Sequence, residues 1–422
     1  MTIAQSLKAS GFADVIVFLK PKTGASADTA PSKVMRHFRS HPGSQDAALL
    51  EALGAKTNFG RASARAAAGG TSAAFTSIAD TAPPSARHYP YLGLVLGTVE
   101  RADLVALKKE PGVAGIVEAP QLRLIKPVLK QAATVAPGFT WGLRELGVDQ
   151  LHAQGITGKG ILIGHLDTGD DDSHPALKGV VKFFAEFDSL GSEVPGAAAS
   201  DSDEHGTHTA GTIAGQLVQG VQFGVAPGAR LASAMVIEGG RVLARILGGM
   251  NWVVGKKVRV LSMSLGLPGL DPAFLAFTQT LRARGVLPVF AVGNEGAGTS
   301  RYPGNSAEAL SVGAMDSAGA VADFCSSQRF KRKQDPIVPD LAGPGVDVVS
   351  CVPGGKYMQM SGTSMAAPHI AGLAALLMQA KPKRTIDEIE AAIFKSCALR
   401  PGMLVSRASR GFPNGPKALS LL

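Results

Sequence analysis

The sequence has few cysteines, few aromatic residues and no long apolar run. Its 422 residues include only Cys325, Cys351 and Cys397, which lack the spacing of a disulfide framework or a metal site. So sparse and odd a count is typical of a reducing compartment, where such cysteines serve as small buried apolar residues. Aromatic residues make up 5%, which argues against a base-stacking surface for single-stranded nucleic acid. No apolar run reaches the roughly 18 residues of a membrane helix, so no span is expected.

The N-terminus carries no secretory signal, because its only apolar run is Val15–Leu19 and no small-residue cleavage site follows. We therefore expect cytoplasmic residence, with export by a non-standard route as the alternative. The net charge is +9, and most of the basic excess lies in the first third of the chain. These charges are scattered rather than clustered, which favours a solvated surface over docking on nucleic acid or another acidic partner.

The first third of the sequence is typical of a small α+β module. The expected elements are, in chain order, a strand over 13–20, a helix over 45–54, a strand over 91–99, a helix over 100–109 and a strand over 112–118. This order suits a ferredoxin-like, split βαβ unit. Residues 55–90 are rich in Ala, Gly, Ser and Thr and are predicted to be a flexible insertion.

A different pattern follows residue 140. Residues 119–140 hold three prolines and no acidic residue, which is typical of a linker. From Trp141 onward, apolar runs alternate with helical stretches, and strands are expected over 160–166, 229–238, 258–265, 286–292 and 309–315. Such buried strands alternating with helices predict an α/β fold with a parallel sheet flanked by helices. The stretch 364–379 is apolar nearly all round, so we expect a helix that runs through the core.

Three segments carry residues that suit nucleophilic catalysis. ILIGHLDTG places Asp167 at the end of an apolar strand, DEHGTHTAG places His205 at a helix start, and MSGTSMAAPHIAG places Ser364 at another. A serine hydroxyl needs an imidazole to take its proton and a carboxylate to orient that imidazole. Each residue alone has an ordinary structural explanation, as a strand-end or helix cap. The three motifs together favour catalysis.

With these motifs, residues 141–422 resemble the subtilisin-type serine proteases, the subtilase family. Further matching segments are GVAPGARL at 224–231, LSMSLG at 261–266, VFAVGNEG at 289–296, RYPGN at 301–305, VPDLAGPGVDVVS at 338–350 and GFPNGPKAL at 411–419. The resemblance implies a serine endopeptidase that acts on extended polypeptide, without a cofactor, on a parallel sheet flanked by helices. A non-catalytic, permanently latched binding protein of the same fold is the alternative.

The resemblance also implies a role for each site residue. Ser364 is the nucleophile, His205 the general base and then acid, and Asp167 the carboxylate that orients the imidazole. The Asn294 side chain and the backbone N–H of Ser364 stabilise the oxyanion. The substrate-binding residues implied are an edge strand of Ser264, Leu265 and Gly266, and a facing wall of Ala291, Val292 and Gly293.

Arg301 stands where the family places the floor of the pocket for the side chain before the cut. Its guanidinium would shorten the pocket and favour Glu or Asp there. Alternatively, Arg301 points into solvent and the pocket keeps a broad apolar preference. We favour this second hypothesis, because residues 119–143 contain no acidic residue at which the linker would be processed.

Residues 91–125 resemble a subtilase inhibitor-type prodomain, although the insertion departs from compact family prodomains. The resemblance implies a prodomain over 1–125 that assists folding and inhibits the enzyme, with the segment after Glu118 in the active-site cleft. A linker over 126–140 is then cut during maturation, and residues 141–422 form the catalytic domain. A permanently attached domain without an inhibitory role is the alternative.

Many subtilases hold a calcium ion at a site where this sequence has Ala176 and Val218 in place of oxygen donors, so we expect no metal there. The acidic clusters Asp170–Asp172 and Asp201/Asp203/Glu204 are predicted to form a solvated face, or a negative rim that favours basic substrate residues away from the cut, with a cation site outside the family's calcium position as the alternative. The basic run Arg329–Lys333 is expected to be an exposed loop, with a nucleic-acid or localisation role as the alternative.

Overall fold

A computed structural model describes residues 3–20, 29–38, 86–119, 123–237, 242–269 and 275–422 of the chain. Contacts divide the chain into two units, Met1–Ala119 and Pro120–Leu422. None of the described helices is long and apolar enough to cross a membrane.

The first unit is an antiparallel sheet with helices. Its described elements are α1 (Ile3–Ser10), β1 (Phe12–Leu19), α2 (Thr29–Met35), β2 (Ala86–Tyr89), β3 (Leu94–Glu100), α4 (Arg101–Leu107) and β4 (Val113–Glu118). The sheet order is β2-β3-β1-β4, and β1 pairs antiparallel with both of its neighbours, β3 and β4. From β1 onward the elements follow the strand–helix–strand–strand–helix–strand order expected for a ferredoxin-like unit. The helix predicted over 45–54 and most of the insertion predicted over 55–90 lie outside the described residues. The prediction of a flexible insertion is wrong for Ala86–Tyr89, which forms β2 and pairs with β3.

The second unit is built on a seven-stranded sheet, in which every pairing is parallel. Its order is β19-β16-β14-β12-β8-β11-β9. The strands are β8 (Leu162–Asp167), β9 (Val181–Glu186), β11 (Arg230–Met235), β12 (Val260–Met263), β14 (Leu287–Ala291), β16 (Leu310–Met315) and β19 (Leu341–Pro344). The parallel α/β fold expected from the sequence is confirmed. Strands β9 and β19 were not predicted.

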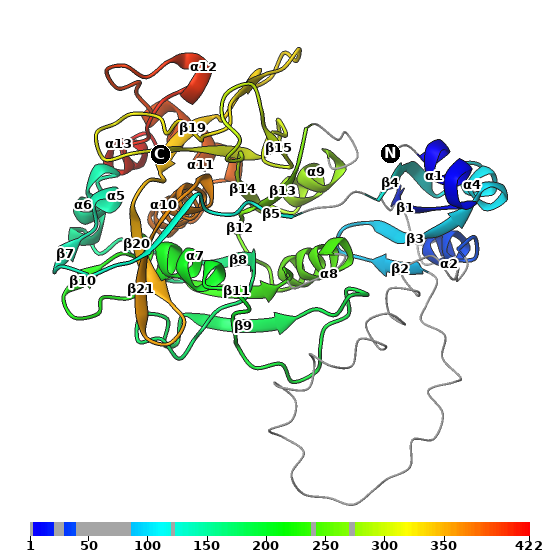
Figure 1. Ribbon diagram of the computed structural model, residues 1–422, viewed down its shortest axis with the longest axis horizontal. Coiled ribbons are helices and arrows are strands. Elements are labelled where there is room, and N and C mark those ends of the chain that lie inside the picture. The colour runs from blue at the N-terminus through cyan, green and yellow to red at the C-terminus, as the bar shows by residue number, and fades with distance from the viewer. Residues whose placement is uncertain (1–2, 21–28, 39–85, 120–122, 238–241, 270–274) are drawn as a thin grey trace, which may run out of the picture. The chain divides into compact units, whose positions relative to one another are not determined.

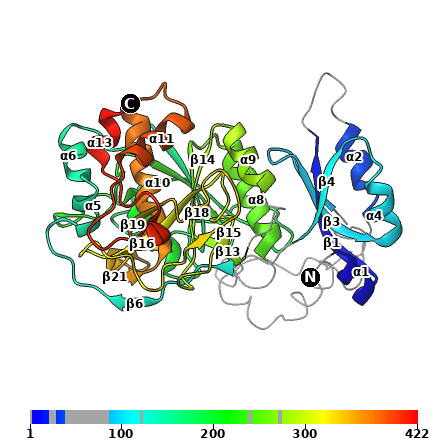
Figure 2. The ribbon, with the colours of Figure 1, turned by 90° about the horizontal axis from the view of Figure 1, so that it is seen from above.

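Helices cover both faces of this sheet, so its strands are buried on two sides. The described helices of this unit are α5 (Trp141–Glu145), α6 (Val148–Ala153), α7 (His205–Ala214), α8 (Val242–Gly255), α9 (Leu275–Ala283), α10 (Thr363–Ala380), α11 (Ile386–Ser396), α12 (Val405–Ala408) and α13 (Gly415–Ser420). Helix α10 packs on α7 and on β12, β14, β16 and β19, whereas α8 packs on β8 and β11. Figures 1 and 2 show α8 and α10 on opposite sides of the sheet. As expected, α10 is a core helix, buried from Thr363 to Met378.

Further short strands lie outside the main sheet. They are β5 (Arg123–Leu124), β6 (Leu129–Ala132), β7 (Gly138–Phe139), β10 (Val221–Gln222), β13 (Leu265–Pro268), β15 (Arg301–Tyr302), β17 (Gln328–Arg329), β18 (Ile337–Val338), β20 (Val348–Val352) and β21 (Lys356–Ser361). Strand β5 pairs with β13, β6 with β21 and β7 with β10. The segment predicted as a linker is therefore part of the second unit and pairs with other strands of that unit at both β6 and β7.

Candidate active site

The predicted triad residues lie on three elements of the second unit, of which α7 and α10 pack against each other. Asp167 ends strand β8, His205 begins α7 and Ser364 lies in the first turn of α10. The turn after β8 can approach α7 closely only because Gly206 has no side chain, since a Cβ atom there would lie 1.9 Å from the carbonyl oxygen of Gly169. The carboxyl end of a parallel strand thus meets the start of a helix, a frequent site of catalytic groups in α/β folds.

Asp167 and His205 form a buried hydrogen-bonded pair. The distance from His205 Nδ1 to Asp167 Oδ1 is 2.6 Å, and the two side chains are 0% and 2% exposed. The backbone N–H of Thr168 donates to the same carboxylate oxygen. Burial alone would raise the pKa of Asp167, but His205, His165 and the Thr168 N–H together outweigh burial and lower it. The ionised carboxylate therefore holds a proton on Nδ1 and leaves Nε2 as the proton acceptor.

The nucleophile faces the chain's own backbone. Ser364 Oγ donates a hydrogen bond of 2.6 Å to the carbonyl oxygen of Ile125. Among the described residues, His205 Nε2 has no hydrogen-bond partner although it is buried. The serine proton is therefore directed to Ile125 and away from the imidazole.

Asn294 contacts the next carbonyl of the same segment. Its Nδ2 donates to the carbonyl oxygen of Lys126 at 2.9 Å. Its Oδ1 accepts from the N–H of Thr363 at 2.9 Å and from Thr363 Oγ1 at 2.8 Å. Thr363, which the sequence analysis did not single out, thereby fixes which end of the Asn294 amide faces the segment.

The predicted edge strand carries this segment as an antiparallel partner. Leu124 lies opposite Leu265 and Arg123 opposite Gly266, and the N–H of Ile125 donates to the carbonyl of Ser264 at 3.0 Å. Further along, the N–H of Val128 donates to the carbonyl of Ser361 at 2.8 Å, and β6 then runs along β21. The described part of the segment is thus extended across the site.

An acidic pair holds the far end of this segment. Lys130 Nζ lies 2.9 Å from a carboxylate oxygen of Asp203 and 3.0 Å from one of Glu204. Burial alone would raise the pKa of Asp203, but its hydrogen bond with Lys130 helps lower it to about 2. Part of the predicted negative rim therefore binds a basic residue of this chain.

Asp170 was placed wrongly on a solvated face. Its side chain is 0% exposed and lies 3.2 Å from His165, a buried histidine that the sequence analysis did not single out. A run of three aspartates is typical of a solvated surface, which is why the sequence misled. The one available signal was His165, a polar residue within the apolar strand β8, which needs a polar partner when buried. Asp172 is exposed, as predicted.

The remaining predicted substrate residues lie at the end of β14 and beside it. Ala291 and Val292 are buried, and Gly293 follows with φ of +122°, a conformation that favours glycine. Arg301 Nε and Nη2 lie 2.8 and 2.6 Å from one oxygen of Glu295, and Nη1 donates to the carbonyl of Gly266 at 3.2 Å. The Arg301 side chain is only 16% exposed and its charge is paired with the half-exposed Glu295, so the favoured hypothesis that Arg301 points freely into solvent is wrong.

At the position where many subtilases hold calcium, the residues of this chain do not suit a hard cation. Ala176 is fully buried and contributes only a methyl side chain. Val218 forms an isolated bridge with Val221 through the backbone. Across the described ranges, no cluster of three or more His, Cys, Asp or Glu side chains is arranged to hold a metal ion.

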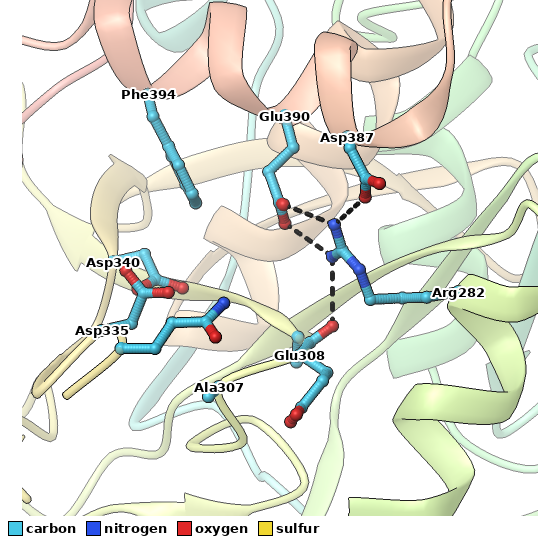
Figure 3. Close-up of a pocket in the computed structure, with 10 residues that line it drawn as sticks. Arg282, Ala307, Glu308, Asp335, Asp340, Asp387, Glu390 and Phe394 are labelled. Atoms are coloured by element: carbon cyan, nitrogen blue, oxygen red, sulfur yellow. Dashed lines mark hydrogen bonds and ion pairs between the residues drawn. The ribbon is translucent and has the colours of Figure 1, made fainter. Parts of the chain in front are cut away.

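A polar cavity of about 390 Å³ lies among other residues of the second unit (Figure 3). Arg282 reaches into it and pairs with Glu390 and Asp387 at 2.7 and 2.5 Å. Burial is the main reason why the pKa of Asp340, on the opposite wall, is raised to about 7. None of the predicted site residues lines this cavity, and its ion pairs account for its polarity.

Comparisons with known proteins agree with this geometry. The model of the subtilase family matches residues 158–415. An alkaline protease of Alkalihalobacillus alcalophilus is 35% identical over 283 residues, 66% of this chain and 67% of the relative. Subtilisin E of Bacillus subtilis is 32% identical over 311 residues, covering 72% and 75%. The major intracellular serine protease of the same organism is 36% identical over 268 residues, covering 61% and 80%.

Proposed function

The chain belongs to the subtilase family as a subtilisin-like serine endopeptidase, and we propose that it is made as a self-inhibited precursor that works through an acyl-enzyme. The observations that support the proposal are the buried Asp167–His205 pair and the chain's own segment bound at Ser364 and Asn294. The proposed domains are an inhibitory prodomain over 1–125, a linker over 126–140 that is cut in maturation, and a catalytic domain over 141–422.

In the proposed reaction, Ser364 Oγ attacks the carbonyl carbon of the bond to be cut. His205 Nε2 takes the hydroxyl proton and then gives it to the leaving amine. Asp167 keeps the imidazole in the required tautomer. The acyl-enzyme that remains is hydrolysed by water, which His205 activates in the same way, and Ser364 regains its proton.

Asn294 is proposed to stabilise the negative oxygen of the tetrahedral intermediate together with the backbone N–H of Ser364. Its amide is already oriented by Thr363, so no reorganisation is needed when the charge develops. A donor of this kind contributes about 10²–10³ in kcat, a magnitude established in a subtilisin itself.

The edge formed by Ser264, Leu265 and Gly266 supports polypeptide as the substrate. An extended peptide can pair with this edge in the way that Arg123–Ile125 does. A helical peptide cannot, because its backbone groups are already bonded to one another. Unfolded chains and extended loops are therefore the proposed substrates.

Self-inhibition is supported by the mismatch between two contacts. Ser364 holds the carbonyl of Ile125, whereas Asn294 holds the carbonyl of Lys126. Catalysis requires Ser364 to attack the same carbonyl group that Asn294 stabilises. Here the two residues contact the carbonyls of two different residues. The segment is thus bound like a substrate but is not aligned for cutting.

A serine-directed fluorophosphonate probe tests the proposal on the full-length protein, incubated and followed by mass spectrometry. We expect a new N-terminus within residues 126–140, followed by labelling and peptidase activity, and neither in Ser364→Ala. Full activity of the intact chain would refute the inhibited precursor. Absence of labelling under all conditions would support the latched binding protein, which the contact between Ser364 and Ile125 also favours.

A further inference from the structure

A second aspartate–histidine pair lies at the other oxygen of Asp167. His165 precedes Asp167 on β8 with Leu166 between them, so the two side chains share one face of the sheet. His165 Nδ1 lies 3.2 Å from Asp170 Oδ1, and His165 Nε2 lies 3.7 Å from Asp167 Oδ2. Exposure of the three side chains is 2% or less.

Thr209 of α7 connects the two pairs. Its Oγ1 lies 2.8 Å from His165 Nε2 and donates to Asp167 Oδ2 at 3.2 Å. The carbonyls of His205 and Gly206 lie 3.2 and 3.0 Å from the same hydroxyl, but the carboxylate is charged and therefore the stronger acceptor. An Nε2–H of His165 that donates to Thr209 leaves the threonine proton for Asp167.

The surroundings favour a charged His165. The ionisable groups that face it are Asp170, Asp167 and Asp201, and its Nδ1 also lies 3.4 Å from Ser233 Oγ. Burial would lower the pKa of His165, but these carboxylates, with Asp170 foremost, outweigh burial and raise it to about 8. Burial raises the pKa of Asp170, and His165 opposes that rise and favours the ionised carboxylate. A buried ion pair adds little stability over apolar residues of similar size, which leaves room for a role beyond folding.

We propose that His165 is a positioning residue for Asp167, held by Asp170 and acting through Thr209 on the carboxylate oxygen that His205 does not bind. The relay fixes the plane of the carboxylate and thereby the direction of the His205 imidazole. The positive end of the His165–Asp170 pair faces Asp167, so it also limits how strongly Asp167 stabilises the imidazolium of His205. This inference rests on the proposed roles of Asp167 and His205.

The test compares full-length protein, incubated until its peptidase activity is constant, with three variants. His165→Val/Asp170→Val removes the pair without leaving an unpaired charge. We expect kcat to fall about tenfold with KM unchanged, because Asp167 is less well oriented. We expect the acidic limb of kcat/KM to move up by about half a pH unit, because the His205 imidazolium loses a positive neighbour.

Two further variants separate geometry from charge. His165→Gln/Asp170→Asn keeps a donor toward Thr209 and should recover kcat while the acidic limb stays shifted. Thr209→Val removes the connection but keeps the shape and the charges, so kcat should fall while the limb stays in place. His152→Gln, at a histidine that binds the Val225 carbonyl, is the control and should match the wild type.

Unchanged kcat and an unchanged acidic limb in a folded His165→Val/Asp170→Val variant would overturn the inference and leave the pair a structural role only. Should that variant fail to fold, unchanged kcat in Thr209→Val would overturn it equally. An inactive wild-type protein would instead refute the proposed roles of Asp167 and His205, so the two failures are distinguishable.

Discussion

The contact of Lys130 with Asp203 and Glu204 predicts that a charge reversal opens the precursor. The three side chains are 28%, 37% and 35% exposed, so solvent screens both ion pairs strongly. Together the pairs contribute about 1 kcal/mol to holding the segment, which is about fivefold in the equilibrium between bound and released segment. Lys130→Gln loses this attraction. Lys130→Glu adds repulsion of similar size, for a total of about 2 kcal/mol or about thirtyfold.

The assay follows the lag before full-length protein cleaves a quenched-fluorescence peptide. We expect the lag to shorten in the order wild type, Lys130→Gln, Lys130→Glu, and the differences to shrink as salt is raised. Lys178→Glu makes the same change of net charge at an exposed position of the same unit and should behave like the wild type. Equal lags in all four proteins at low salt would refute the reasoning.

Four other predictions follow from the site and its surroundings. Asn294→Ala should lower kcat about 10²–10³-fold with little change in KM, measured on the processed enzyme. Arg301→Gly should deepen the pocket and raise cleavage after large apolar residues in a peptide library, whereas an acidic preference in the wild type would contradict the pairing of Arg301 with Glu295. EDTA should change the Tm by less than about 2 °C, because Ala176 offers no oxygen donor, and a larger drop reversed by calcium would contradict this. The pKa of Asp340 is raised from 3.8 to about 7, so its contribution to stability is lost as pH rises between these values, and the Tm of Asp340→Asn should gain on the wild type from about pH 4 to about pH 7 and stay level above that.

Long apolar strands and long motifs were the parts of the fold that the sequence predicted well. Strand β8 is buried along most of its length and reads as one apolar run. Strand β9 was missed because it lies at the sheet edge, where partly exposed residues interrupt the pattern. Strand β19 was missed because its four residues, LAGP, include a glycine and a proline, which are typical of turns.

Pairings between distant residues were the parts of the site that the sequence did not predict. The sequence-based hypotheses for Arg301 placed its guanidinium either in the substrate pocket or in solvent. Neither included Glu295, six residues earlier in the chain, which forms an ion pair with Arg301. Nor does spacing along the chain bring Asp170 back to His165, because the chain must first turn at Gly169 after the strand ends. Electrostatic environment depends on which charges meet in space, so pocket polarity and pKa shifts needed the structure.

The linker was predicted from composition, and composition does not show that a segment pairs with strands from distant parts of the chain. Residues 123–139 form strands only because β13, β21 and β10 each supply a partner, and two-residue strands such as β5 have no sequence signature of their own. The edge that binds the segment is the one proposed to bind substrate, so the two compete. A tethered segment competes at an effective concentration on the order of millimolar, well above that of most polypeptide substrates. The contacts between the segment and the edge therefore need not be strong for the segment to inhibit. One cut within residues 126–140 relieves the inhibition because it removes the tether, without weakening any contact.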